Sequence, residues 1–288
     1  MPDPQIPDSL SLTKALAIFV QSAGTQSQRH IKPVHQYIAT RLVIEGGFLP
    51  DEITPHPPLR VETVQNEHKL IFDPGAAGED ERTVMGGLKT KDIDVVVEKA
   101  GVGPVLAVSV KGTTGAFRNL TNRMEEAIGD STNLHIMYPG LVYGFFQIIK
   151  ANREGAPGID ANDVAIQANG TVVTSIRRYH DVLANLAGRQ FVRDDFTRYE
   201  AVGFALADTA ADMPGRVMDL FPHPESALRV ERFFPNLLQI YDLRFPYIAA
   251  SLTSLKRRFW SRTSPAFQST ESGTDAIGNL LGYEPRME

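Results

Sequence analysis

The stretch Asp92-Ile-Asp-Val-Val-Val-Glu-Lys-Ala-Gly-Val-Gly-Pro-Val-Leu-Ala-Val-Ser-Val-Lys111 is the most informative segment for the fold of this chain. Two runs rich in β-branched residues, Val95–Val97 and Val105–Val108, flank the segment Gly101–Pro104. Such runs are typical of buried strands, and a Gly- and Pro-containing link between them is typical of a turn. The sequence therefore predicts an antiparallel hairpin over residues 92–110.

Polar side chains lie where the two predicted strands meet. Asp94 opens the first run, and Ser109 and Lys111 close the second. Because side chains two apart on a strand share a face, Ser109 and Lys111 point the same way. A carboxylate and an amine at one sheet edge suit metal-dependent phosphodiester hydrolysis, in which the carboxylate binds Mg²⁺ and the amine steadies the phosphate or the attacking water.

A helix is predicted directly after this hairpin. Residues 116–128 have helical periodicity, and Gly129 is expected to end the helix. Glu125 lies beside the apolar stripe and is expected to face the sheet edge, whereas Glu126 is expected to face water or DNA. In the alternative interpretation, both are solvated helix glutamates. The stripe itself consists of Phe117, Leu120, Met124 and Ile128.

The arrangement of these residues resembles that of the PD-(D/E)XK nuclease superfamily, and more closely that of its type II restriction endonucleases. The motif of that family is an Asp that opens one strand, followed by Asp/Glu-x-Lys on the next; Asp94 matches the Asp and Lys111 the Lys. Ser109 departs from the acidic position. A subgroup that cuts sites with a CCGG core also has Ser-x-Lys, with a Glu on the following helix, and Glu125 fits that slot. The resemblance covers about residues 88–150.

The resemblance implies a site and an activity. Asp94 and Glu125 would hold Mg²⁺, for which Mn²⁺ can substitute, and Lys111 would contact the scissile phosphate and the attacking water. Ser109 would occupy the vacated acidic position. Asp92 shares the strand face of Asp94 and is the alternative metal ligand; Asp94 is preferred because the apolar strand begins directly after it, as in the family.

The first helix offers another acidic residue. Residues 31–45 are predicted to be helical, with Pro33 in the first turn and Gly46-Gly47 as the stop. Glu45 falls on the apolar stripe of this helix, where a carboxylate needs a partner. In the nuclease family, an acidic residue of the first helix often lies near the metal, so Glu45 is a candidate ligand. In the alternative interpretation, Glu45 turns to solvent.

Composition excludes several classes of protein. The 288 residues include no cysteine, which excludes disulfides and thiolate metal sites and favours a cytoplasmic protein. The seven histidines show no zinc-binding spacing and are expected to be structural or on the surface. The N-terminus does not have the pattern of a secretory signal. The most apolar stretch, residues 136–149, is too short to span a bilayer, so no membrane partner is expected.

One segment is cationic although the formal net charge is −5. Residues 244–270 contain five basic residues and no acid. Because DNA affinity depends on local phosphate contacts, this segment is the predicted DNA-binding region, and a solvated helix end is the alternative. Trp260 is expected to pack in the core, although stacking on a base is possible. The candidate DNA contacts are Lys256, Arg257, Arg258 and Arg262.

The elements expected along the chain indicate an α/β protein with a restriction-endonuclease-like core. We expect a mixed sheet of four or five strands flanked by helices, with helical extensions. Residues 1–288 would form a single nuclease domain, with a catalytic core at about 31–207 and a C-terminal helical extension at about 208–288. Further helices are expected at 11–22, 175–187, 225–239 and 248–260, strands at 59–72, 141–149 and 199–206, a hairpin at 164–174 and a loop at 73–90.

The function expected from the resemblance is sequence-specific cleavage of double-stranded DNA by a type II restriction endonuclease. A palindromic site favours a homodimer or tetramer. Two alternatives remain open. One is a repair or recombination nuclease of the same fold, and the other is an inactive nucleic-acid-binding protein, because Ser109 breaks the standard motif.

Overall fold

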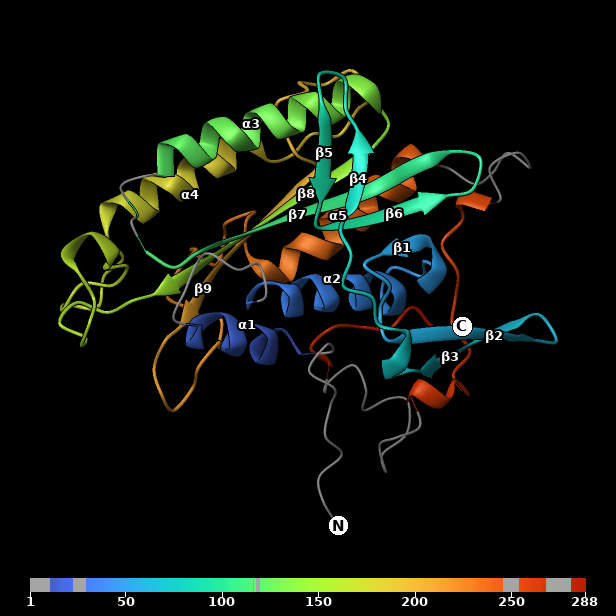
Figure 1. Cartoon of the computed structure of the whole chain (residues 1–288), viewed down its shortest axis with the longest axis horizontal. Coiled ribbons are helices and arrows are strands. Elements are labelled where there is room, and N and C mark those ends of the chain that lie inside the picture. Colours follow the sequence, from blue (N-terminus) through green and yellow to red (C-terminus); the bar gives the residue numbers. More distant parts are fainter. Residues whose placement is uncertain (1–10, 23–29, 116, 118–119, 246–253, 268–280) are drawn as a thin grey trace, which may run out of the picture.

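A five-stranded mixed sheet forms the centre of the protein, in the strand order β1-β6-β7-β8-β9 (Figure 1). The computed structural model describes residues 11–22, 30–115, 117, 120–245, 254–267 and 281–288. Strands β1, β6 and β7 are antiparallel neighbours, whereas β7, β8 and β9 run parallel. The strands are β1 (Ile53–Thr54), β6 (Val95–Lys99), β7 (Gly103–Thr113), β8 (Val142–Ala151) and β9 (Ala201–Asp208).

The β6–β7 hairpin confirms the prediction made from residues 92–110. Val95 pairs with Val108, and the register shifts between Val97 and Glu98. Gly101 in the turn and Gly103 at the start of β7 have φ angles of 77° and 94°, a region that favours glycine. Both strands are buried along most of their length, so the hairpin is a rigid base for residues at its open end.

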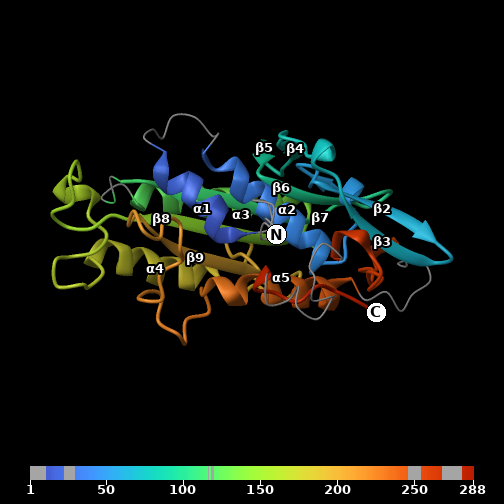
Figure 2. The same ribbon diagram turned by 90° about the horizontal axis from the view of Figure 1, so that it is seen from below.

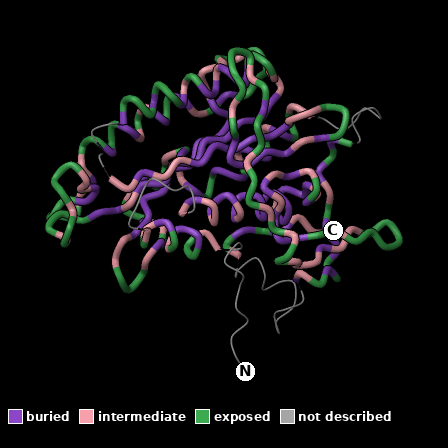
Figure 3. Tube along the Cα trace, viewed as in Figure 1, coloured by how far each residue is buried: buried purple, intermediate pink, exposed green. Residues whose placement is uncertain are grey.

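Helices cover both faces of the sheet, which gives three layers (Figures 1 and 2). α1 (Leu12–Gln21), α2 (Lys32–Ile44) and α5 (Val230–Arg244) pack on one face, and α3 (Leu120–Met137) and α4 (Thr174–Leu186) pack on the other. The sheet between them is buried (Figure 3). The chain is therefore a mixed α/β protein with a five-stranded sheet, as the sequence predicted.

Two smaller hairpins precede β6. One consists of β2 (Leu59–Val64) and β3 (Glu67–Phe72), within a segment where strand structure was predicted. The other consists of β4 (Arg82–Met85) and β5 (Thr90–Ile93). The prediction of a loop over residues 73–90 was therefore wrong in its second half. In β4 the side chain of Val84 is buried and its neighbours are exposed, which is the alternation typical of a strand. Short 3₁₀ turns lie at Pro50–Glu52, Pro74–Ala76, Ala161–Asp163 and Pro265–Phe267.

Helix α3 is longer than predicted. It continues through Gly129 to Met137, so the expected end at Gly129 was wrong. The second half of the helix buries Ser131, Asn133 and Leu134, and this tertiary packing outweighs the low helix propensity of one glycine. The predicted helices at 11–22, 31–45 and 175–187 are confirmed within a residue or two as α1, α2 and α4.

The later elements confirm some predictions and correct others. The strands predicted at 141–149 and 199–206 are confirmed as β8 and β9, whereas the helix predicted at 225–239 begins and ends later, as α5. The hairpin predicted at 164–174 is reduced to a turn with isolated bridges, one of them between Ile166 and Val172. Residues 248–253, the first part of the helix predicted at 248–260, lie outside the described part.

The described C-terminal segment 254–267 is not α-helical. Trp260 is fully buried and donates a hydrogen bond from Nε1 to the carbonyl oxygen of Val43 at 2.7 Å. The expectation that Trp260 packs in the core is confirmed, but a helix over 254–260 was wrong because these residues lie along the end of α2. Across the described residues, no helix has both the length and the apolar character needed to cross a membrane.

Candidate metal centre

Asp94 lies at the bend between β5 and β6 and is largely buried, with 8% of its surface exposed. Its Oδ2 accepts a hydrogen bond from the backbone amide of Val110 in β7 at 2.7 Å. Its Oδ1 lies 3.6 Å from Nε2 of His35 in α2. The β6–β7 hairpin thus fixes one oxygen of the carboxylate and leaves the other directed towards α2.

Three side chains from separate segments meet at this point. Asp94 is joined by His35 and by Glu81, which directly precedes β4, and one ligand atom from each lies within 4.8 Å of the others. His35 is buried, at 2% exposure. Among the described residues, His35 Nε2 and Glu81 Oε1 are buried atoms without a hydrogen-bond partner. Buried polar atoms are normally paired, so two unpaired atoms beside one carboxylate make this group a candidate metal site.

The surroundings of the metal-ligand group shift the pKa values of both neighbours of Asp94, His35 and Glu81. Burial lowers the pKa of His35, an effect opposed by Asp94 and reinforced by Lys111 and Lys32. Burial raises the pKa of Glu81, as do Asp94 and Asp92, and the same two lysines oppose this. An unprotonated imidazole has a lone pair for a metal, and a carboxylate beside other carboxylates gains from a cation.

The donor set fits a divalent cation. Around Mg²⁺ or Mn²⁺, ligand atoms lie about 2.1 Å from the ion, so neighbouring ligands are about 3 Å apart and opposite ones about 4 Å apart. The 3.6 Å between His35 and Asp94 falls within this range, and all three ligand atoms lie within 4.8 Å of one another. Two carboxylates and an imidazole would therefore close around an ion with small side-chain movements.

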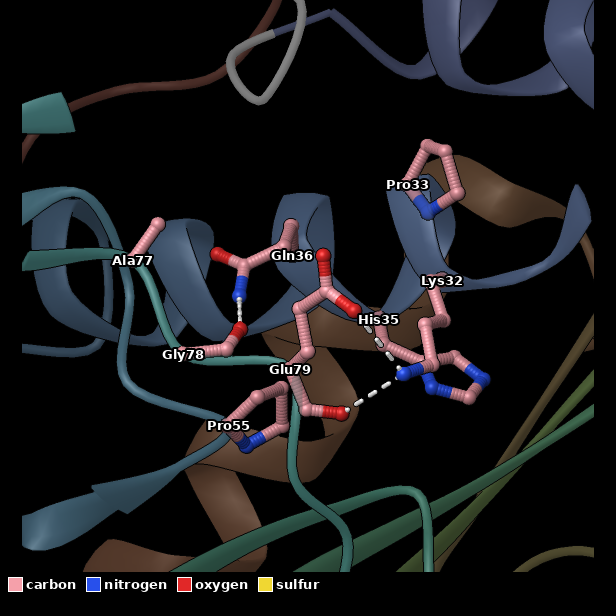
Figure 4. Close-up of a pocket in the computed structure, with 8 residues that line it drawn as sticks. All are labelled: Lys32, Pro33, His35, Gln36, Pro55, Ala77, Gly78 and Glu79. Carbon is pink, nitrogen blue, oxygen red and sulfur yellow. Dashed lines mark hydrogen bonds and ion pairs between the residues drawn. The ribbon is translucent and has the colours of Figure 1, made fainter. Parts of the chain in front are cut away.

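Glu81 is held in place by contacts between its loop and α2. Gln36 donates a hydrogen bond to the carbonyl oxygen of Gly78, and Lys32 contacts both the backbone and the carboxylate of Glu79 (Figure 4). The loop and the first half of α2 line an open pocket of about 580 Å³. His35 is among its lining residues, so the pocket adjoins one member of the metal-ligand group.

The structure brings together several residues that the sequence singled out. Asp94 and Lys111 both act electrostatically on His35 and Glu81, and Asp92 acts on Glu81. Asp94 is buried and reaches His35, whereas Asp92 is exposed and accepts a hydrogen bond from Thr83 across β4 and β5. This geometry favours Asp94 over Asp92 as the central ligand.

Ser109 lies in β7 with Lys111 and is buried, at 1% exposure. Its Oγ accepts a hydrogen bond from the hydroxyl of Tyr143 in β8 at 3.0 Å. Burial raises the pKa of Tyr143 well above its ordinary value, so this phenol stays a hydrogen-bond donor at neutral pH. Ser109 therefore links β7 to β8 beside the metal-ligand group.

Glu125 and Glu45 do not lie in the metal-ligand group. Glu125 is exposed on α3 and is not among the described residues whose ligand atoms gather at Asp94. Its neighbour Glu126 is also exposed and lies 3.9 Å from Lys91. Glu45, at the end of α2, forms a 2.6 Å ion pair with Arg41 in the same helix. In the described structure, Glu81 occupies the place beside Asp94 that was expected for Glu125.

The predicted DNA-contacting residues differ in their surroundings. Arg257 is buried and donates to the carbonyl oxygens of Gly46 and Glu45 and to the carboxylate of Asp242. Arg258 is half-buried, and its backbone amide donates to the carbonyl oxygen of Gly47. Lys256 and Arg262 are exposed, and Arg262 donates to the carbonyl oxygen of Glu288. Arg257 is thus occupied in holding the C-terminal segment against the end of α2.

His35 and Glu81 were missed by the sequence interpretation. His35 lies three residues before Ile38 and seven before Leu42, so it shares their core-facing stripe, and a polar side chain there needs a partner. The same reasoning had selected Glu45. Glu81 gave only a weaker signal, as the last residue of the acidic run Glu79-Asp-Glu81 before β4.

Comparisons with known proteins add no assignment. No family model matches the chain, and no curated protein or solved structure matches it.

Proposed function

We propose that this protein is a metal-dependent endonuclease that hydrolyses phosphodiester bonds of double-stranded DNA, in the manner of a type II restriction endonuclease. One observation carries the proposal. Two carboxylates and an imidazole, with two of their atoms unpaired and buried, converge at one sheet edge where Lys111 acts on them. The proposal is supported by the antiparallel β6–β7 pair and the parallel β8 after α3, because Asp94 directly precedes β6 and Lys111 lies in β7, the order that the PD-(D/E)XK motif has.

Each residue has a defined part in the proposed reaction. Asp94, Glu81 and His35 would hold Mg²⁺ or Mn²⁺, which would supply Lewis-acid stabilisation of charge on the phosphate. Lys111 carries a positive charge near this group and would hold the scissile phosphate. Ser109, held by Tyr143, keeps the Lys111-bearing strand in place next to β8. The open pocket beside α2 adjoins His35 and is the side from which water would approach the site.

The test is cleavage of a plasmid in Mg²⁺ or Mn²⁺. We expect discrete fragments with the wild-type protein and none in EDTA, and loss of cutting by orders of magnitude in Lys111→Ala. The control is Lys69→Ala, a lysine of the β2–β3 hairpin away from the group. Nicks that depend on DNA structure would indicate a repair nuclease, and binding without any cutting would indicate an inactive DNA-binding protein.

The second carboxylate can be assigned in the same assay. Glu81→Gln should lose cutting if Glu81 completes the site, whereas Glu125→Gln should lose it if the restriction-enzyme resemblance holds at that position. Both substitutions keep the size of the side chain and remove only its charge. The two outcomes are distinct because Glu81 lies beside Asp94 and Glu125 is exposed on α3.

A further inference from the structure

The metal-ligand group contains a nitrogen donor, and this sets it apart from an all-oxygen site. His35 comes from the first half of α2, where its ring is enclosed and only its Nε2 faces Asp94. Nε2 has no hydrogen-bond partner among the described residues. A buried ring nitrogen without a partner is unfavourable unless something binds it, so the imidazole is placed as a ligand.

The carboxylates of Asp94 and Glu81 supply the other two ligand atoms of the metal-ligand group. Asp94 has one oxygen bound to Val110 and the other directed at His35, which leaves a single oxygen for a cation. Glu81 has a buried Oε1 without a partner among the described residues, and it lies on a loop that α2 holds through Gln36. The group therefore offers two oxygens and one nitrogen from three segments that are far apart in the sequence.

We propose that His35, Glu81 and Asp94 form a mixed nitrogen–oxygen site that takes Mn²⁺ in preference to Mg²⁺. The proposal deepens the proposed function and rests on it only for the role of the ion in cleavage. Mg²⁺ demands oxygen ligands and keeps much of its hydration shell, whereas imidazole suits first-row transition cations. Co²⁺ and Zn²⁺ should bind more tightly still, because affinity rises along that series.

The experiment measures metal binding without DNA. Mn²⁺ is titrated into the metal-free full-length protein and its free concentration is followed by electron paramagnetic resonance, with Mg²⁺ as competitor. We expect one Mn²⁺ per chain and displacement only by a large excess of Mg²⁺. His35→Gln replaces the ring nitrogen by an amide oxygen, and it should weaken Mn²⁺ binding by at least about tenfold while changing Mg²⁺ binding much less.

Two further variants make the result decisive. Glu81→Gln alters a residue in a loop, so a folded protein is expected, and it should weaken binding of both ions. His223→Gln changes an exposed histidine outside the group and should change neither affinity. Circular dichroism of each variant checks that the fold is retained.

Several outcomes would overturn the proposal. Equal affinity of the wild-type protein for Mn²⁺ and Mg²⁺ would do so, as would Mn²⁺ binding that is unaffected by His35→Gln. Loss of binding in Glu125→Gln but not in Glu81→Gln would place the ion elsewhere. Because no DNA is present, these results are separate from cleavage. A protein that binds Mn²⁺ as expected but cuts no DNA would sink the proposed function and leave the metal site standing.

Discussion

At the scale of single residues, Asp94 combines a structural role with a proposed chemical one. Its Oδ2 is the partner of the buried Val110 amide, and its Oδ1 faces His35. Removal of the whole carboxylate would therefore affect both stability and metal binding. Substitutions that keep an oxygen at this position separate the two effects.

Asp94→Asn should abolish cleavage but keep most of the stability, because an amide oxygen can still accept from Val110. Asp94→Ala should also lower the free energy of unfolding by about 1–3 kcal/mol, since it leaves a buried amide unpaired. Asp92→Asn is the matched control, because Asp92 is exposed. Urea unfolding and plasmid cleavage measure the two effects. Normal cutting by Asp94→Asn and none by Asp92→Asn would reverse the assignment.

At the scale of elements, the β4–β5 hairpin connects the metal-ligand group to α3. Glu81 precedes its first strand and Asp94 follows its second. At the far end, Asn133 of α3 accepts from the amides of Leu88 and Lys89 and donates to the carbonyl oxygen of Lys89. Figure 1 shows this end of the hairpin against α3. Because α3 holds one end of the β4–β5 hairpin, Glu81 and Asp94 are also held in position at the other end.

Asn133→Ala should release the tip of the hairpin. It leaves the two amides without their buried acceptor, so we expect stability to fall by about 1–3 kcal/mol. Hydrogen exchange at Leu88 and Lys89 should become faster, and Mn²⁺ affinity should fall although Asn133 touches no ligand. Thr132→Ala, one residue away on the same helix, is the control. Unchanged hydrogen exchange at these amides would show that the contacts of Asn133 do not hold the tip of the hairpin in place.

The C-terminal segment gives a second prediction at this scale. Because Arg257 donates to two carbonyl oxygens at the end of α2 and to Asp242, Arg257→Ala should cost roughly 3 kcal/mol of stability.

DNA binding is better tested at the exposed Lys256 and Arg262. If either side chain binds a phosphate, its replacement by alanine should reduce the slope of log affinity against log salt by about one unit. A stable Arg257→Ala protein with a flatter salt dependence would instead place Arg257 on the DNA.

At the scale of the whole molecule, a buried charge network ties the layers together. Glu200 accepts from Arg189 at 2.6 Å and lies 2.6 Å from Arg244 in α5. Its other oxygen accepts from the backbone amide of Tyr143 at 2.7 Å and lies 3.4 Å from His135 in α3. One carboxylate thus connects helices on opposite faces of the sheet with the start of β8.

Glu200→Gln should destabilise the protein by about 3–5 kcal/mol at neutral pH, because two buried guanidinium groups lose their counter-charge. Burial alone would raise the pKa of Glu200, but His135, Arg244 and the Tyr143 amide hold it below its ordinary value of 4.5. The stabilisation is therefore complete above that pH and is lost as the pH falls through the lower folded-state pKa.

Urea unfolding at a series of pH values measures this effect. The difference between the wild-type protein and Glu200→Gln should be constant at neutral pH and narrow below about pH 4.5. Glu231→Gln is the control, since its ion pair with Arg229 is exposed and should contribute little. A difference that does not depend on pH would show that the charge of Glu200 is not the cause.

The amino-acid sequence alone was enough to predict the β6–β7 hairpin and where Asp94, Ser109 and Lys111 lie on it. These follow from the spacing of valines and glycines within 20 residues, from Asp92 to Lys111, and such local patterns need no knowledge of distant contacts. It also predicted α1, α2, α4, β8 and β9, whose periodicity and end signals are local. A mixed sheet of four or five strands followed from these elements, although strand β1 was not predicted.

The side chains that join Asp94 could be identified only from the folded structure. His35 and Glu81 come from α2 and from the loop before β4, and they reach Asp94 because α2 packs against β6 while β4 pairs with β5. Helix periodicity favoured Glu125, but the orientation of α3 depends on the packing of Met124, Ala127 and Leu134, which leaves Glu125 exposed. Contacts between distant segments depend on how whole faces pack, and no local pattern of residues encodes that.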